Sequence, residues 1–461
     1  MSKAPVENKT VDLDGLNPIP LDQRTMSPLS YMMVMWSSAI IVQVMVIGSF
    51  LLQGGLNLYQ TIGVGIVSAL LVGVFMTLNG AAGLKYGIPF TIQARSSFGY
   101  RGAKLPHILR SIPAIAWYGI GTWIGALSIN TVMTMLFDLP DLKYLYFTLL
   151  IILQTIIAIK GIESIAWFDS AMSIIIFVML TYFMWHVFTN GKINFGQYTE
   201  VPGSWGFLFW AGVAGAVANF STVMLNSSDL IRHIKPATQK ASFTANLGGI
   251  IPPWLYMVFS GMIIFMGTGS DDPITALVTL SPTPFFGIVL LIFIVLAQVT
   301  SNLTLNILPP ALVFQDLFKT KWKNGVIITG ILSFVTMPWL LFTSEMFFTF
   351  QNVYSSFLGP ILGIMLADYW FVRRQKVNMK AIYEQSTGVY SYWKGYSPVA
   401  YIAMFVGAVV SFWLLEIAWL VGLPTGFVVY LALKKLGVEK KYEQVEADWI
   451  SVNPPAVEAK N

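Results

Sequence analysis

The sequence of 461 residues contains no cysteine, only three histidines and few charged side chains. The absence of cysteine excludes disulfide bonds, thiolate metal sites and cysteine nucleophiles. Charged residues make up 11% of the chain, whereas a soluble domain carries about a quarter. Because 56% of the residues are hydrophobic, the chain cannot cover itself with an ordinary soluble surface. It is predicted to lie in a membrane.

Motifs for catalysis are also missing. His107, His186 and His233 are scattered and form no metal-ligand or catalytic spacing. No Walker phosphate loop occurs, so ATP is not expected to drive this chain directly. A membrane-embedded enzyme acting on a lipid or isoprenoid would need paired carboxylates or histidines at mid-membrane, and the apolar windows offer none. We therefore expect neither an enzyme nor a cofactor.

Apolar windows long enough to cross the hydrocarbon core of a bilayer, about 20 residues each, recur along almost the whole chain. They are continuous rather than alternating, which favours helices over a transmembrane β-barrel. Twelve windows lie near residues 28–52, 57–79, 105–136, 143–163, 165–189, 205–226, 243–268, 284–310, 325–343, 346–371, 397–415 and 417–434. The expected architecture is an all-α polytopic membrane protein with one transmembrane domain (28–434), an N-terminal tail (1–27) and a C-terminal tail (435–461).

The positions of the basic residues predict the orientation. With twelve spans, both termini and the even-numbered connections share one side, which should hold the excess of lysine and arginine. All 27 lysines and arginines except Lys143 and Lys192 fall there. Both termini are therefore expected in the cytoplasm. The basic cluster 434–441 is interpreted as part of this orientation signal, so no nucleic-acid partner is expected.

Polar side chains gather inside one strongly apolar window, 284–310. They are Gln298, Thr300, Ser301, Asn302, Thr304 and Asn306. Hydroxyl and amide groups often only link neighbouring helices, but this many would be costly to satisfy in hydrocarbon. The cluster therefore favours a binding site. The adjacent hydroxyls of Thr300 and Ser301, together with carbonyls from a broken helix, would suit a sodium ion.

Other windows carry weaker signals. Trp117 lies deep in the third window, where its indole offers a stacking face for a planar ring. The small residues 211–218 of the sixth window favour close helix packing at least as much as a site. Asp169, Asp229 and Asp368 fall at window ends near arginines, which predicts ion pairs and helix-end contacts. Because no chain of buried carboxylates suggests a proton relay, sodium is favoured over protons as the coupling ion.

From about residue 17 to 436, the sequence resembles the nucleobase-cation-symporter-1 family, which includes hydantoin, allantoin, uracil and cytosine permeases. The resemblance rests on Asn79-Gly80, the segment 85–90, Arg95 to Gly99 with Gly102, Trp117 to Gly119 with Thr122 and Trp123, Leu225-Asn226 with Asp229, Asn302 with Asn306, Leu358 to Pro360 with Ala367 to Tyr369, and the segment 388–395. It implies a LeuT-type fold in which two five-helix inverted repeats (28–200 and 201–375) have broken first helices, followed by two further helices at 397–434.

The resemblance also implies the site residues. The sodium site would use backbone carbonyls of Ser38, Ile41 and Ala297 and the hydroxyls of Thr300 and Ser301. The substrate site would use Gln43 or Val42 from the first window, Trp117, Gly121, Asn219, Phe220 and Asn306, with Leu358 as a gate. The expected setting is the cell membrane, the inner membrane of a bacterium, and the expected assembly is a monomer.

Three positions depart from the pattern of the family. Gly121 stands where relatives usually have a glutamine, and Asn219 precedes Phe220 where the hydantoin transporter has glycine before tryptophan. Gln43 stands one residue later than expected, about 100° around a helix. These changes suggest a relocated polar contact, or a bulkier ligand above Gly121.

The sequence thus predicts a secondary active transporter that couples sodium to uptake of a nucleobase, hydantoin or allantoin-like ring. The ring would lie between Trp117 and Phe220, with Asn219, Gln43 and Asn306 bonding its amide edges. A proton-coupled permease of the same family and an amino-acid carrier of the same fold remain alternatives. A channel would need a selectivity ring instead of a tight site, and counterflow exchange of labelled substrate would distinguish it from a carrier.

Overall fold

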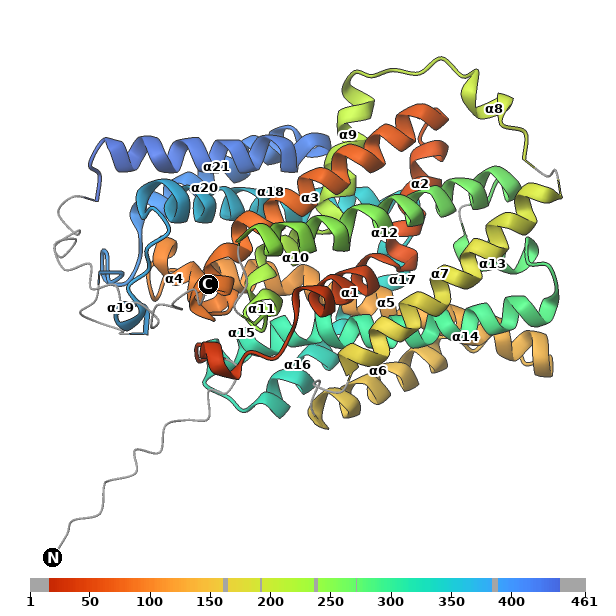
Figure 1. Cartoon of the computed structure of the whole chain (residues 1–461), viewed down its shortest axis with the longest axis horizontal. Helices are drawn as coiled ribbons and strands as arrows, with labels where there is room; N and C mark the ends of the chain where they lie inside the picture. The colour runs from red at the N-terminus through yellow and green to blue at the C-terminus, as the bar shows by residue number, and fades with distance from the viewer. Residues whose placement is uncertain are drawn as a thin grey trace, which may run out of the picture.

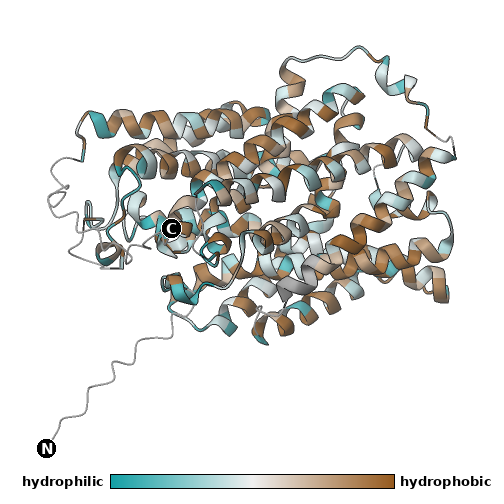
Figure 2. Cartoon of the chain, viewed as in Figure 1, coloured by the Kyte–Doolittle hydropathy of each residue, from teal (hydrophilic) through white to brown (hydrophobic). Residues whose placement is uncertain are grey.

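The computed structural model describes residues 16–160, 165–190, 193–235, 239–270, 272–383 and 389–439. Most of both predicted tails, the side chain of Asp169 and position 388 of the family-like segment lie outside the described residues. The described chain is built from helices, most of which run along one common direction (Figure 1). Figure 2 shows hydrophobic residues along these helices, while hydrophilic residues gather mainly near the end that carries α4 and α19.

The helices follow the predicted windows. In chain order they are η1 Leu21–Gln23, α1 Pro28–Ala39, α2 Val42–Gln53, α3 Leu58–Tyr86, α4 Phe90–Phe98, α5 Lys104–Phe137, α6 Lys143–Lys160, α7 Ile165–Thr189, α8 Gly196–Thr199, α9 Phe207–Asn219, α10 Ser221–Leu225, α11 Ser227–Ile231, α12 Gln239–Thr268, α13 Pro273–Thr279, α14 Pro284–Ser301, η2 Asn302–Ile307, α15 Leu308–Phe318, α16 Trp322–Val335, α17 Pro338–Leu341, α18 Met346–Leu366, η3 Ala367–Val372, α19 Met379–Tyr383, α20 Pro398–Trp413, η4 Leu415–Ile417 and α21 Ala418–Lys435.

Eight spans in the described chain are long and apolar enough to cross a membrane, and the bent pair α1 and α2 makes a ninth. Three shorter apolar helices, α9, α16 and α20, occupy the remaining windows. This set agrees with twelve spans. The prediction missed the short helices α4 and α13, because each is only a few residues long and lies in a connection between windows.

The first span is packed tightly against the seventh through two glycines. A Cβ atom at Gly48 of α2 would lie 2.0 Å from the Val258 carbonyl oxygen of α12. A Cβ atom at Gly261 of α12 would lie 1.8 Å from the Met45 carbonyl oxygen. Ser49 Oγ also donates a hydrogen bond of 2.9 Å to the Gly261 carbonyl. In lipid, such close backbone approach replaces the hydrophobic effect as the source of helix association.

Gly48→Ala is expected to destabilise the protein by about 1–3 kcal/mol, because α2 and α12 must separate to admit the methyl group. The matched variant is Gly65→Ala on α3, which faces the same helix but meets only side-chain atoms, at 3.4 Å or more. Thermal unfolding of both variants in detergent measures the difference. Equal melting temperatures would contradict this packing.

Candidate functional site

The first span is interrupted near its middle. Helices α1 and α2 meet at an angle of 49° across Ile40 and Ile41. The break leaves the last carbonyl groups of α1, including that of Ser38, without partners inside the helix. Ser38 is buried, and Ile41 is partly buried. Non-helical backbone at membrane depth occurs only where protein or a cavity surrounds it, so this break is a candidate binding point.

The sixth span is interrupted as well. Helix α9 ends at Asn219, Phe220 departs from helical geometry, and α10 begins at Ser221. The Tyr354 hydroxyl of α18 donates a 2.7 Å hydrogen bond to the Ala218 carbonyl oxygen beside the break. The same hydroxyl accepts a 3.2 Å hydrogen bond from Trp117 Nε1. The indole of α5 is thereby held beside the broken sixth span.

Asn219 carries an unsatisfied donor at this break. Its side chain is 5% exposed, and its Nδ2 has no hydrogen-bond partner among the described residues. An amide donor left unpaired in the interior costs about 1–3 kcal/mol. Because Asn219 lies directly at the break of the sixth span, its unpaired donor is a candidate contact for a ligand that supplies an acceptor.

The two aromatic residues predicted to enclose a ring have different neighbours. Trp117 packs edge-on against Phe347, with centroids 5.9 Å apart. Phe220 packs edge-on against Trp254 of α12, with centroids 5.0 Å apart. Both rings are buried. The rings of Trp117 and Phe220 thus pack against aromatic residues of two different helices, α18 and α12.

The polar cluster of the eighth span coincides with a change in helix type. Residues Asn302–Ile307 form a π-helix between α14 and α15, a feature often found at functional sites. Asn302 Nδ2 donates to the Tyr118 carbonyl oxygen (3.2 Å), Thr122 Oγ1 (3.2 Å) and Gln154 Oε1 (3.1 Å). Its Oδ1 accepts a 2.9 Å bond from Asn306 Nδ2.

Asn302 also explains the glycine at position 121. A Cβ atom on Gly121 would lie 2.6 Å from Asn302 Oδ1 and 2.9 Å from Nδ2. The space above Gly121 is therefore filled by Asn302, and the idea of a bulkier ligand there is wrong. The other explanation, a relocated polar contact, stays a prediction.

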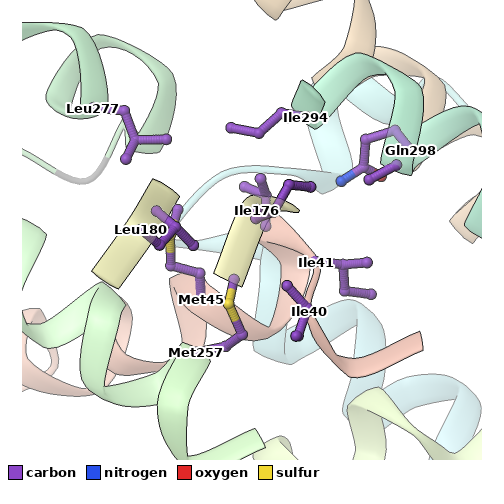
Figure 3. Close-up of a pocket in the computed structure, with 11 residues that line it drawn as sticks. Ile40, Ile41, Met45, Ile176, Leu180, Met257, Leu277, Ile294 and Gln298 are labelled. Carbon is purple, nitrogen blue, oxygen red and sulfur yellow. The ribbon is translucent and has the colours of Figure 1, made fainter. Parts of the chain in front are cut away.

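The residues predicted to bind sodium belong to two elements: Ser38 and Ile41 lie at the break of the first span, and Ala297, Thr300 and Ser301 lie on α14. Thr300 and Ser301 are buried, and Thr300 Oγ1 donates a 3.1 Å bond to the Ala297 carbonyl. A small, mainly apolar pocket beside the break is lined by Ile40, Ile41, Val42, Met45, Ile176, Leu180, Met257, Leu277, Ile294, Ala297 and Gln298 (Figure 3). Two of the predicted carbonyl donors, Ile41 and Ala297, thus line one space with Val42.

Gln43 is paired with another amide. Its Nε2 donates to Gln298 Oε1 at 2.9 Å, and Gln298 Nε2 donates back to Gln43 Oε1 at 3.1 Å. Both side chains are buried. The predicted gate residue Leu358 is buried on α18, one turn beyond Tyr354. Of the residues named here, Tyr354, Gln154 and Trp254 were missed, although a tyrosine or glutamine inside an apolar window was the available signal.

The contacts between helices differ in kind at the two ends of the bundle. Toward the end with α8 and α13, Phe50 of α2 meets Phe347 of α18 at 5.4 Å between centroids. Toward the end with α4 and α19, Asn79 Nδ2 donates to the Met224 carbonyl at 2.9 Å, and Gln93 Nε2 donates to Asn79 Oδ1 at 3.1 Å. Aromatic rings thus meet toward one end, and amide hydrogen bonds join the helices toward the other.

Of the three acidic residues at window ends, Asp229 and Asp368 make the predicted contacts, and the side chain of Asp169 lies outside the described residues. Asp368 pairs with Arg373, with Oδ2 and Nε 2.7 Å apart. Asp229 Oδ1 accepts a 2.7 Å bond from the backbone N–H of Phe90 at the start of α4. Among the described residues, no group of three or more histidine or acidic side chains could hold a metal ion.

Comparisons with known proteins agree with this architecture. Residues 18–433 match the family model described as permease for cytosine/purines, uracil, thiamine, allantoin. The allantoin permease of Bacillus subtilis is 27% identical over 83% of this chain and 84% of its own length. The purine-uracil permease of Arabidopsis thaliana is 30% identical over 90% of this chain and 74% of its own length.

A solved structure shows the fold. A nucleobase-cation-symport-1 family transporter, in a closed conformation with bromovinylhydantoin bound, superposes with a TM-score of 0.84 at 23% identity, covering 96% of this chain and all of that one. The predicted LeuT-type fold is confirmed by this likeness. With its broken first and sixth spans and its match over residues 18–433, the chain belongs to the family of permeases for cytosine/purines, uracil, thiamine and allantoin, and it is a membrane transporter rather than an enzyme.

Proposed function

We propose that this transporter couples a sodium gradient to the uptake of a planar heterocycle with amide edges, a nucleobase, hydantoin or allantoin-like ring. The observation that carries the proposal is the unpaired Asn219 amide beside the broken sixth span, close to the buried indole of Trp117. A flat ring offers a stacking face to the indole. Its carbonyl groups offer acceptors to the amide donor.

The remaining substrate contacts are proposed from the polar cluster of the eighth span, α14 and η2. Asn306 is partly buried, and its Nδ2 is fixed on Asn302. This bond uses the Nδ2 of the Asn306 side chain and leaves its amide oxygen, Oδ1, to accept a hydrogen bond from a ring N–H. Phe220 forms the far wall, supported by Trp254. Leu358 covers the side of α18.

Sodium is proposed to bind between the break of the first span and α14. The donors are oxygens, which hard cations prefer: the carbonyls of Ser38, Ile41 and Ala297 and the hydroxyls of Thr300 and Ser301. Sodium and substrate must bind more tightly together than apart for transport to be coupled. A proton-coupled carrier is the alternative, and it would lack a response to sodium at constant pH.

The proposed topology completes this function. Both termini and the end with α4 face the cytoplasm, as the distribution of lysine and arginine favours, and the membrane is the inner membrane of a bacterium. The repeats comprise 28–200 and 201–375, and the transporter acts as a monomer. A screen of nucleobases, nucleosides, hydantoins, allantoin and aromatic amino acids by thermal shift, with and without sodium, tests ligand and ion together. Stabilisation by amino acids alone would favour the amino-acid carrier.

Trp117→Ala is expected to abolish the thermal shift and uptake of a ring ligand, because the stacking face is lost at about 1–3 kcal/mol per base. Trp117→Phe keeps a ring but loses the bond to Tyr354, so an intermediate loss is expected. Trp123→Phe on the same helix is the matched control. Its ring packs instead against Tyr144 and Trp339. Normal affinity in Trp117→Ala would rule out stacking.

Thr300→Ala combined with Ser301→Ala is expected to raise the sodium concentration needed for half-maximal uptake about tenfold or more, because two oxygen ligands are lost. The matched control removes two buried hydroxyls elsewhere, Thr329→Ala with Ser333→Ala. Both of those bond only carbonyls of their own helix, α16. Sodium titration of uptake in proteoliposomes provides the measurement. An unchanged sodium response would remove these hydroxyls from the site.

Gly121→Ala is expected to weaken ring binding about tenfold, because the methyl group displaces Asn302 and with it the bonded Asn306. Gly125→Ala, one turn further along α5, is the comparison. Its methyl group would meet the flexible end of Leu150 at 3.1 Å, so a smaller effect is expected. Binding affinity and melting temperature measured on both variants separate lost recognition from lost stability. Equal ring affinity in the two variants would contradict positioning by Asn302.

A further inference from the structure

The paired amides of Gln43 and Gln298 join two parts of the bundle. Helix α2 packs chiefly against α12, and α14 packs chiefly against α5. The pair bridges these two groups with two reciprocal hydrogen bonds of 2.9 and 3.1 Å. The side chains are 3% and 2% exposed. Because both amides are buried, parting them would leave two donors and two acceptors to be satisfied by water or a ligand.

The pair of Gln43 and Gln298 lies beside the proposed cation site. Gln43 lies in the first turn of α2, two residues after Ile41 in the break. Gln298 directly follows Ala297 on α14, and it lines the same small pocket as Ile41 and Ala297 (Figure 3). A bond between these two amides therefore fixes how far apart two proposed cation-binding carbonyls lie. Gln298 is the only polar side chain among the described residues that line this pocket.

Gln298 is also fixed on the side of α5. A Cβ atom at Gly125 would touch the Gln298 Cβ at 3.9 Å, and a Cβ atom at Gly121 would clash with Asn302. Two glycines one turn apart thus face two amide-bearing residues one turn apart. Asn302 in turn holds Asn306. A row of three amides on the eighth span therefore leads from the break of the first span to the proposed ring-binding residue Asn306.

We propose that Gln43 and Gln298 form an amide clasp that positions the cation site and couples it to substrate binding. The proposal rests on the sodium-coupled function above. With the clasp closed, Ile41 and Ala297 are held at one separation. A ligand that engages Gln43 pulls on the same hydrogen bonds, so ligand and cation each change the affinity of the other. In this scheme Gln298 is a positioning residue that does not touch the ring.

The test uses leucine substitutions in the full-length protein: Gln43→Leu, Gln298→Leu and the double variant. Each single variant leaves one buried amide unpaired and is expected to lower the melting temperature. The double variant removes both amides and is expected to be at least as stable as either single one, since two apolar groups of similar shape then meet. All three are expected to bind sodium at least about fivefold more weakly than the wild type, a typical coupling factor.

The readout is a thermal-shift titration with sodium chloride against potassium chloride at constant ionic strength, repeated with hydantoin, allantoin and uracil as probes. In the wild type, a ring probe should raise the apparent affinity for sodium. In the clasp variants, the ring probe should no longer change the sodium affinity. Gln315→Leu on α15 is the matched control, a buried glutamine whose Oε1 has no partner among the described residues. It is expected to keep the sodium affinity of the wild type.

The possible results separate the clasp from the function. If the double variant regains both stability and sodium affinity, the pair is only structural and the clasp is overturned. Wild-type sodium affinity in both single variants would overturn it as well. A wild type that binds ring probes without any sodium response would instead overturn the sodium coupling, and the clasp with it. Weak sodium binding in a stable double variant supports the proposal.

Discussion

The need to satisfy backbone hydrogen bonds inside a bilayer governs this structure. An unbroken helix meets that need by itself, so each interruption requires partners from neighbouring helices. At the sixth span, the Tyr354 hydroxyl donates a hydrogen bond to the Ala218 carbonyl and accepts one from the Trp117 indole N–H. The break of the sixth span, the indole of Trp117 and α18 are therefore linked by hydrogen bonds through Tyr354. Changing any of them alters where the unpaired Asn219 amide points.

On the eighth span, amide side chains link neighbouring helices by hydrogen bonds. Gln298 bonds to the first span, Asn302 bonds to α5 and α6, and Asn306 bonds to Asn302. Glutamine and asparagine each offer two donors and an acceptor with two lone pairs. They can therefore hold a neighbour and still present a group to a ligand. The glycines at 121 and 125 provide the room that these side chains need beside α5.

The sequence predicted those features that depend on local pattern. The twelve apolar windows located the spans, because hydropathy alone decides which segments enter lipid. The polar residues of window 284–310 located the amide row for the same reason. The broken first and sixth spans were expected only through resemblance to a family, since no proline lies at Ile40 or Phe220 and both windows read as apolar runs. The pairing of Gln43 with Gln298 spans 255 residues, and no local pattern encodes such a contact.

The contacts at the two ends of the bundle differ in the free energy that breaking them would require. At the end with α4, parting Asn79 from the Met224 carbonyl exchanges protein hydrogen bonds for bonds to water, and the net cost of each is only about 1 kcal/mol. At the other end, parting Phe50 from Phe347 exposes apolar rings at about 25 cal/mol per Å². Ring exposure has no such compensation from water. Phe347 also packs against Trp117, so a planar ligand of the proposed kind that stacks on Trp117 would lie close enough to replace part of the lost aromatic contact, whereas it would not replace the amide hydrogen bonds at the other end.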